Sequence, residues 1–142
     1  MRYLLLIYTD EAGAATASRE DQAALFEEYM VFDRGLDESG RKLGGEALQP
    51  TATATTVRVR DGSTLTTDGP FAETRELVAG FWLWEVKDMA EAVEWVKRCP
   101  NPMPGPSEIE IRPVVDIADF GEAVTPEVAE LHDRNREKTA GR

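Results

Sequence analysis

Two short segments of the chain are apolar at almost every position. Residues 3–8 form a continuous apolar run that is too short for a helix, and such runs are typical of strands covered on both faces. Residues 77–86 are apolar on both alternate sets of positions, which indicates a second strand of the same kind. The pattern therefore predicts that these two segments are the inner strands of one sheet.

Apolar residues recur at helical spacing in two other segments. The first helix is expected to begin at Ser18, which together with Asp21 resembles a capping box, and to end at Gly40. The second helix is expected to begin at Asp88 and to end before Pro100.

Weaker signals predict further strands. Residues 43–48 form a short strand that two glycines make irregular. Residues 56–67 alternate apolar and polar positions around an Asp-Gly pair, which predicts a β-hairpin. Residues 108–115 alternate as well, and Pro113 cannot donate to a ladder, so this strand is expected at a sheet edge.

The order of these elements predicts an α+β fold. It is the pattern of a ferredoxin-like βαββαβ antiparallel sheet with an inserted β-hairpin. Two helices cover only one face of such a sheet, yet residues 77–86 are apolar on both faces, so we expect a second copy of the chain to cover the other face. We assign residues 1–120 to this domain and residues 121–142 to a charged C-terminal helix or tail.

The charge of the chain limits its partners. With 16 basic and 27 acidic residues the net charge is −11, which argues against nucleic acid and anionic membranes. One cysteine and one histidine leave no disulfide within the chain and no cysteine-based or multi-histidine metal site. No glycine-rich phosphate loop is visible, so we expect neither a metal nor a cofactor. The absence of an export signal and of a long apolar segment predicts a cytoplasmic protein.

The most specific motif is a nine-residue block at residues 68–76, DGPFAETRE. Together with AGF at residues 79–81 and IEIRP at residues 109–113, it resembles the signature of the DGPF proteins of the YCII-related (YciI-like) family. The resemblance extends from residue 1 to about residue 115. It implies a ferredoxin-like fold assembled as a dimeric α/β barrel, in bacteria, and an enzyme that acts on small molecules. It also implies a regulatory partner, because some relatives are encoded beside, or fused to, extracytoplasmic-function sigma factors.

One position departs from the better-studied YciI-like relatives. These proteins resemble the chain on the first helix but have a histidine there, which is proposed to work with an aspartate. This chain has Tyr29 at that place. A histidine-dependent acid/base mechanism is therefore not transferred, and Tyr29 is the candidate residue in its stead.

The candidate general acid or base is Asp68. The Asp-Gly-Pro sequence is first of all a turn, in which the aspartate accepts bonds from downstream backbone N–H groups. In the functional alternative, the turn holds the Asp68 carboxylate at a cavity mouth, with Phe71 as an apolar wall and Glu73 nearby.

Arginines and tryptophans are candidates for substrate contacts. Arg58 and Arg60 share one face of the hairpin and, with Arg112, would form a clamp for a carboxylate or phosphate; the alternative is the solvated face of a strand. Trp82 and Trp84 share one face of an inner strand, where they serve as core or dimer interface or, alternatively, as a pocket wall.

Two functions are consistent with these residues. The first is a cofactor-free small-molecule enzyme or ligand-binding protein that works as a homodimer. The second is an accessory protein that binds a sigma factor through its acidic surface and its tail, because an acidic face suits a basic partner.

Overall fold

Helices and strands follow one another in the predicted order. The computed structural model describes residues 1–69, 77–101 and 107–140. Its elements are β1 (Arg2–Thr9), α1 (Glu11–Ala14), α2 (Arg19–Glu38), β2 (Lys42–Ala47), the 3-10 helix η1 (Thr51–Thr53), β3 (Thr55–Arg60), β4 (Ser63–Asp68), β5 (Leu77–Glu85), α3 (Met89–Val96), β6 (Glu108–Pro113), the 3-10 helix η2 (Ile117–Ala123) and α4 (Pro126–Ala140).

An antiparallel sheet with the strand order β2-β5-β1-β6 forms the centre of this α+β fold. β1 and β5 are the inner strands, as their apolar runs predict. β6 lies at one edge, as expected from Pro113, which stands at its end. β2 lies at the other edge, and its register against β5 shifts between Lys42 and Gly44, which is the predicted irregularity.

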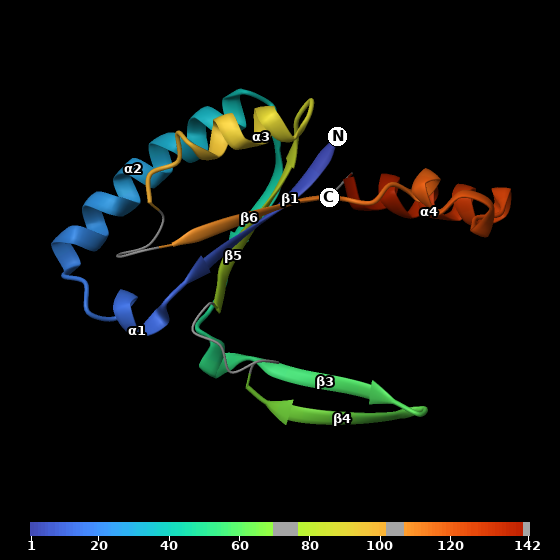
Figure 1. Ribbon diagram of the computed structural model, residues 1–142, viewed down its shortest axis with the longest axis horizontal. Helices are drawn as coiled ribbons and strands as arrows, with labels where there is room; N and C mark the ends of the chain where they lie inside the picture. The colour runs from blue at the N-terminus through green and yellow to red at the C-terminus, as the bar shows by residue number, and fades with distance from the viewer. Residues whose placement is uncertain (70–76, 102–106, 141–142) are drawn as a thin grey trace.

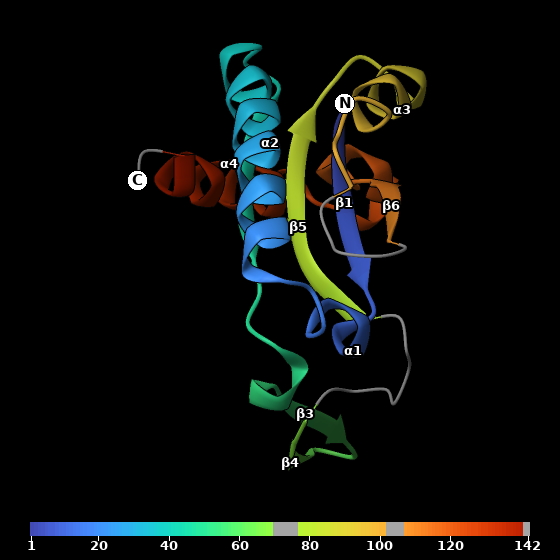
Figure 2. The same ribbon diagram turned by 90° about the vertical axis from the view of Figure 1, so that its left-hand side faces the viewer.

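Helices α2 and α3 cover one face of this sheet (Figures 1 and 2). The side chain of Ser18 accepts a hydrogen bond from the backbone N–H of Asp21 at 3.1 Å, so α2 begins where its cap predicts. The Asp88 carboxylate caps α3 in the same way through the backbone N–H of Glu91 at 2.9 Å. α3 ends at Val96, earlier than the proline expected to end it, because the last two N–H groups before that proline bond three residues back rather than four.

The core lies between these helices and the sheet. Alternate residues of β1 and β5 are buried against the helices, and Leu36 of α2 and Ala92 of α3 complete the contact. The buried apolar residues of the described chain are Tyr3, Leu5, Ile7, Leu36, Trp82, Trp84, Val86 and Ala92. The aromatic residues of β5 therefore anchor α2 to the sheet.

The opposite face of the sheet carries apolar side chains without a helix over them. Leu4 opposes Leu83 and Leu6 opposes Phe81, so these four side chains share one face, and each of them is half-buried. The prediction that β5 is buried on both faces thus holds for one face within a single chain, while the other face stays partly open.

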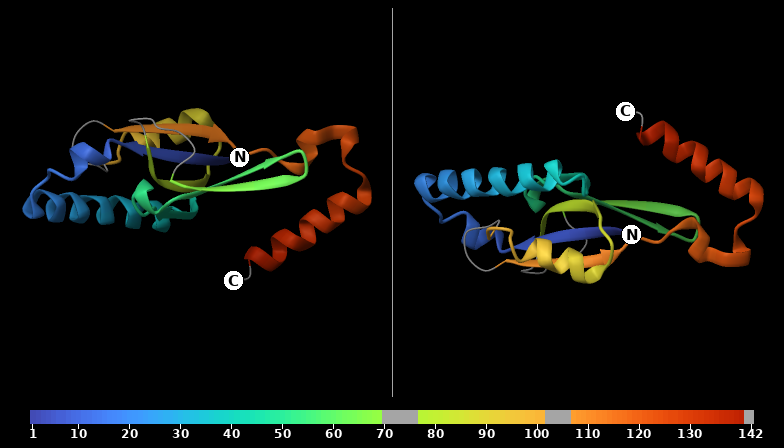
Figure 3. Two further views of the ribbon diagram at one scale, coloured as in Figure 1. Left: turned by 90° about the horizontal axis from the view of Figure 1, so that it is seen from below. Right: turned by 90° about the horizontal axis from the view of Figure 1, so that it is seen from above.

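The β-hairpin and the C-terminal helix extend from the side of the sheet opposite α2 and α3 (Figures 1 and 3). β3 and β4 pair with each other in a separate two-stranded sheet. Their turn is the predicted Asp-Gly pair, in which Asp61 and Gly62 both have positive φ (52° and 73°). α4 begins after Thr125 and turns back from η2, which lies at the far end of this extension, as Figure 3 shows.

Candidate functional site

A cleft of about 580 Å³ lies between α2 and the sheet. Its walls are the N-terminal half of α2, the segment around α1 and residues 46–50, and its floor is formed by the end of β1 and the middle of β5. Most of the lining is apolar, including Ile7, Leu25, Phe26 and Leu48. The cleft is therefore a mainly apolar site with strands of the sheet on one side and side chains of α2 on the other.

A bulge in β5 shapes the floor of the cleft. Ile7 of β1 opposes Gly80, but the next residue, Tyr8, opposes Val78, so Ala79 is an extra residue in β5. Gly80 and Ala79 both line the cleft. A Cβ atom on Gly80 would lie 2.8 Å from the backbone oxygen of Glu46, so only glycine fits between β5 and β2 at this point.

Thr9, at the end of β1, is a buried polar residue beside the cleft. The residue is 6 % exposed and lines the cleft. Its Oγ1 atom has no hydrogen-bond partner among residues 1–69, 77–101 and 107–140. A buried hydroxyl without a partner is costly in a folded protein, and this atom is covered by protein rather than open to the cleft.

Tyr29 lines the cleft from α2. Its ring stacks on Trp82 with a centroid distance of 5.7 Å and an interplanar angle of 13°. Burial, and after it the charge of Asp33, raises the pKa of Tyr29 above its usual value. The phenol therefore keeps its proton at neutral pH and offers an uncharged hydroxyl.

Among the described residues that line the cleft there are two acidic residues, Glu11 and Glu46, and no lysine or arginine. The Glu11 carboxylate accepts hydrogen bonds from the backbone N–H and from the hydroxyl of Thr51, both at 2.9 Å. This pair of bonds ties the segment of α1 to η1 and closes one end of the cleft. The electrostatic environment of the cleft is unfavourable for an anion.

Comparison with known proteins places this architecture in a family. The family model of the YCII-related domain matches residues 1–118. The chain belongs to the YCII-related family. It is also similar to an uncharacterized protein of Rhizobium meliloti (strain 1021), with 36 % identity over 115 residues, which cover 80 % of this chain and 92 % of that protein.

Trp82 and Trp84 of this YCII-related protein lie in the core. Their rings stack with a centroid distance of 5.3 Å, and Phe32 packs against both. Trp82 is 2 % exposed and reaches the cleft through Tyr29, which stacks on it. The sequence left a core role and a pocket-wall role open, and the burial of both rings agrees with the core role.

Asp68 stands at the end of β4, opposite Thr55, and is exposed. It does not line the cleft. The next residue, Gly69, has φ 101° and donates its N–H to the backbone oxygen of Ala54 at 2.7 Å, so this residue of the nine-residue block is tied to the end of η1, just before β3. Phe71 and Glu73, the other candidates of this block, lie outside the described residues.

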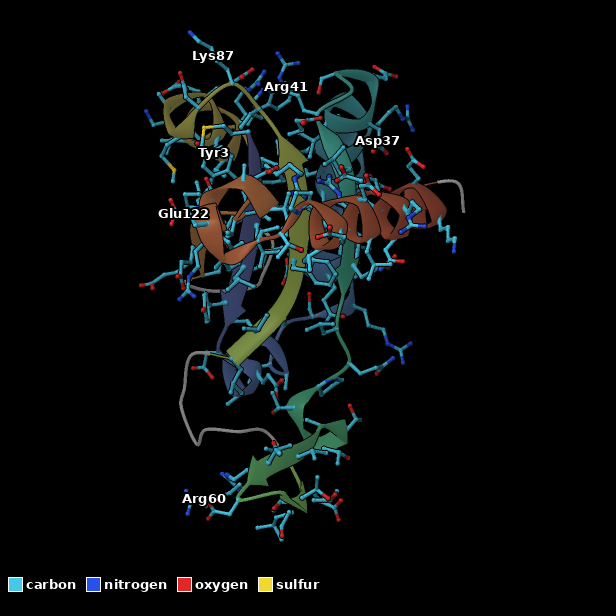
Figure 4. The ribbon with its side chains drawn as sticks, turned by 90° about the vertical axis from the view of Figure 1, so that its right-hand side faces the viewer. Tyr3, Asp37, Arg41, Arg60, Lys87 and Glu122 are labelled. Carbon is cyan, nitrogen blue, oxygen red and sulfur yellow. The ribbon has the colours of Figure 1, made fainter. Side chains whose placement is uncertain are left out.

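The three candidate arginines lie on two different sheets. Arg58 and Arg60 are exposed on β3, and Arg60 lies beside the turn of the hairpin, away from the large sheet (Figure 4). Arg112 lies on β6, where it forms an ion pair with Glu110 of the same strand. Glu110 also accepts a hydrogen bond from the Tyr8 hydroxyl at 2.9 Å. One copy of the chain thus joins Arg58 with Arg60 but does not bring Arg112 to them.

The sequence pointed to Tyr29 but missed most of this cleft. Thr9 directly follows the apolar run of residues 3–8, which is a signal that could have been noticed. Leu25 and Phe26 were indistinguishable from core residues of a helix. Within the described ranges no group of three His, Cys, Asp or Glu residues is placed to hold a metal ion, and no helix is long and apolar enough to cross a membrane.

Proposed function

We propose that this YCII-related protein binds a small, largely apolar molecule in the cleft between α2 and the sheet, and that it does so as a homodimer. The observation that carries the proposal is the cleft itself. Its volume of about 580 Å³ lies within the range of about 300–1,000 Å³ that is usual for ligand pockets. Its lining is apolar with a few polar groups, which is also the usual composition of such sites.

The proposed role is binding without a cofactor. Catalysis by Asp68 and Tyr29 together requires both groups at one site, and Asp68 lies on the hairpin outside the cleft of its own chain. Tyr29, whose pKa is raised by burial, is a poor general base near neutral pH. Binding is therefore the activity that the described residues of the cleft support best.

Binding is tested by a fragment screen that monitors backbone amide shifts by NMR. We expect several neutral fragments to shift the amides of Thr9, Tyr29 and Gly80. Leu25→Trp fills the cleft and should abolish these shifts, whereas Ala23→Trp, on the exposed side of α2, should leave them intact. A screen in which no fragment shifts cleft amides, or in which both variants behave alike, would refute the proposal.

The open face of the sheet supports the homodimer. Leu4, Leu6, Phe81 and Leu83 are half-buried there, and the hairpin and α4 extend from the same side of the sheet (Figure 1). Both extensions carry exposed large apolar side chains: Val57, Val59, Leu65, Val128 and Leu131. A second copy seated on this face, between the two extensions, buries them and joins two ferredoxin-like subunits into a dimeric α/β barrel.

Light scattering after gel filtration tests the dimer. The wild-type protein is expected at twice the mass of 15.7 kDa. Leu6→Asp places a charge on the open face and should give a monomer, while Val31→Asp, on the exposed surface of α2, should stay dimeric. A wild-type protein that elutes with the mass of a monomer, when all three proteins are measured at one concentration, would contradict the proposal.

A second candidate function is supported by α4. The helix lies on the side of the sheet opposite α2 and α3 (Figure 1), and Val128 and Leu131 are about half exposed on it. We propose this helix, in a protein with a net charge of −11, as the contact for a basic surface of an extracytoplasmic-function sigma factor in the cytoplasm. Truncation after Phe120 tests this role. The role is supported if the truncated protein stays dimeric but no longer binds a sigma factor of the same genome. It is contradicted if the truncated protein binds as well as the full chain, or if the full chain does not bind at all.

A further inference from the structure

We propose that the cleft takes a planar aromatic ring, which stacks on the ring of Tyr29 and is flanked by Phe26. This inference rests on the proposed function, because it names the chemical class of ligand that the same cleft binds. It also identifies Tyr29 and Phe26 as the residues that determine the preference for an aromatic ligand.

Three aromatic rings form a continuous stack that runs from the core to the cleft. Trp84 is fully buried and stacks on Trp82 with a centroid distance of 5.3 Å and an interplanar angle of 29°. Trp82 is 2 % exposed and stacks in turn on Tyr29, at 5.7 Å and 13°. Tyr29 is half-buried and lines the cleft, whereas the two tryptophans do not line it. The stack therefore ends in the cleft, at the ring of Tyr29.

The end of this stack is a favourable place for a further flat ring. Aromatic pairs prefer offset-stacked or edge-to-face arrangements, and a planar ligand ring can adopt one of them against Tyr29. A puckered saturated ring has no π-system and gains only the burial of its apolar surface. Because Tyr29 rests on two buried rings, the ligand meets an aromatic surface that is already ordered before binding.

Phe26 supplies a second aromatic surface beside Tyr29. The two residues are three positions apart on α2, so their side chains are neighbours on the surface of the helix. Both of them line the cleft. Phe26 is 66 % exposed, so most of its ring takes no part in the packing of its own chain. A ring that binds on Tyr29 would bury apolar surface of Phe26 as well, which adds to the affinity.

Two glutamines of the lining suit a polar substituent on the ring. Gln22 precedes Tyr29 by seven residues on α2, which places it about 10 Å nearer the start of the helix. Its Nε2 atom donates a hydrogen bond to the backbone oxygen of Ala17 at 3.2 Å. Gln49 is exposed on the wall formed by residues 46–50. Amide side chains both donate and accept hydrogen bonds, so an uncharged polar group on the ring, such as an amide, can pair with them.

Benzamide and cyclohexanecarboxamide test the inference, because they carry the same amide group on a flat ring and on a puckered ring. Each compound is titrated against the protein, with the backbone amide shifts as the readout. The wild-type protein should bind benzamide about fivefold more tightly, which corresponds to about 1 kcal/mol. The ring protons of bound benzamide should shift upfield and give NOEs to the ring protons of Tyr29, because they lie over an aromatic face.

Four variants assign the preference to the two rings. Tyr29→Leu should remove most of the preference for benzamide, whereas Tyr29→Phe keeps the ring and should retain it. Phe26→Leu should weaken the binding of benzamide about threefold. Phe120→Leu makes the same change at an exposed residue of η2 outside the cleft and should bind like the wild type. Because Phe26 is exposed, the comparison of Phe26→Leu with Phe120→Leu decides the question even if Tyr29→Leu does not fold.

The outcomes separate this inference from the proposed function. If the wild-type protein binds both compounds equally well, or if Phe26→Leu and Phe120→Leu bind benzamide alike, the inference fails while the cleft stands as a binding site. If neither compound binds but other fragments shift the cleft amides, the inference also fails alone. If no fragment of any kind binds, both proposals fail together.

Discussion

Gly45 of β2 lies directly against β5, and Gly45→Ala should destabilise the protein. A Cβ atom at this position would lie 2.5 Å from Cδ1 of Trp82 and 2.7 Å from the backbone oxygen of Phe81. The backbone of β5 cannot move away without disturbing its pairing with β1, and Trp82 is 2 % exposed. Overpacking of this kind costs about 1–3 kcal/mol, whereas replacing glycine by alanine in the unfolded chain returns about 0.5–1 kcal/mol. The net expectation is a loss of up to about 2.5 kcal/mol.

Gly44→Ala is the matched control in the same strand. A Cβ atom on Gly44 meets nothing within 4 Å, and its φ is not positive. This variant should be as stable as the wild type or more stable by about 0.5 kcal/mol. Urea unfolding of all three proteins at one protein concentration gives the free energies by linear extrapolation. Equal midpoints for Gly44→Ala and Gly45→Ala would refute the reasoning, because the two substitutions differ only in the space they enter.

Further predictions concern individual side chains. Lys42→Met should cost about 1–3 kcal/mol in urea unfolding at pH 7, because it leaves Asp33, whose side chain is 20 % exposed, without the ammonium group 2.7 Å away; adding Asp33→Leu should restore most of the loss, and no recovery would speak against the pair. The pKa of Glu91 is lowered, mainly because its carboxylate accepts a hydrogen bond from the backbone N–H of Lys87. The ionised Glu91 therefore stabilises the folded protein at neutral pH, and this stabilisation is lost as the pH falls below about 4.5 through the lowered pKa. Glu91→Gln should therefore show a smaller drop in melting temperature between pH 7 and pH 3 than the wild type, and an equal drop would contradict this. Burial raises the pKa of Cys99 to about 11, so its reaction with a thiol reagent should be slow at pH 8, accelerate up to about pH 11 and become fast in urea; a fast reaction of the folded protein at pH 8 would contradict the burial.

The arrangement of the sheet could be predicted because it depends on local patterns. Two apolar runs identified the inner strands, Pro113 identified an edge, and Ser18 and Asp88 marked the helix starts. Pro113, Ser18 and Asp88 determine the local hydrogen bonds of the backbone, and the apolar runs determine which strands are buried on both faces. Both kinds of effect depend on residue types that the sequence shows directly.

The cleft could not be predicted in the same way. It depends on a bulge at Ala79, which breaks the two-residue period at one point, and on how far α2 stands from the end of β1. The isolated Gly80 was compatible with either a bulge or a close approach, and the structure combines both. Conversely, Asp68 attracted attention through its motif, but its position depends on the hairpin, whose direction no local pattern encodes.

The construction of the cleft determines which of its residues can be exchanged. Its floor at Gly80 is main chain, and any side chain there would collide with the neighbouring strand. Its wall is a helix on which Phe26 is 66 % exposed, so this residue contributes little to the core, whereas Tyr29 of the same wall stacks on Trp82. Substitutions on the helix can therefore reshape the site at small cost to folding, while the floor cannot vary. Engineering of the cleft should therefore begin at Phe26 and leave Gly80 unchanged.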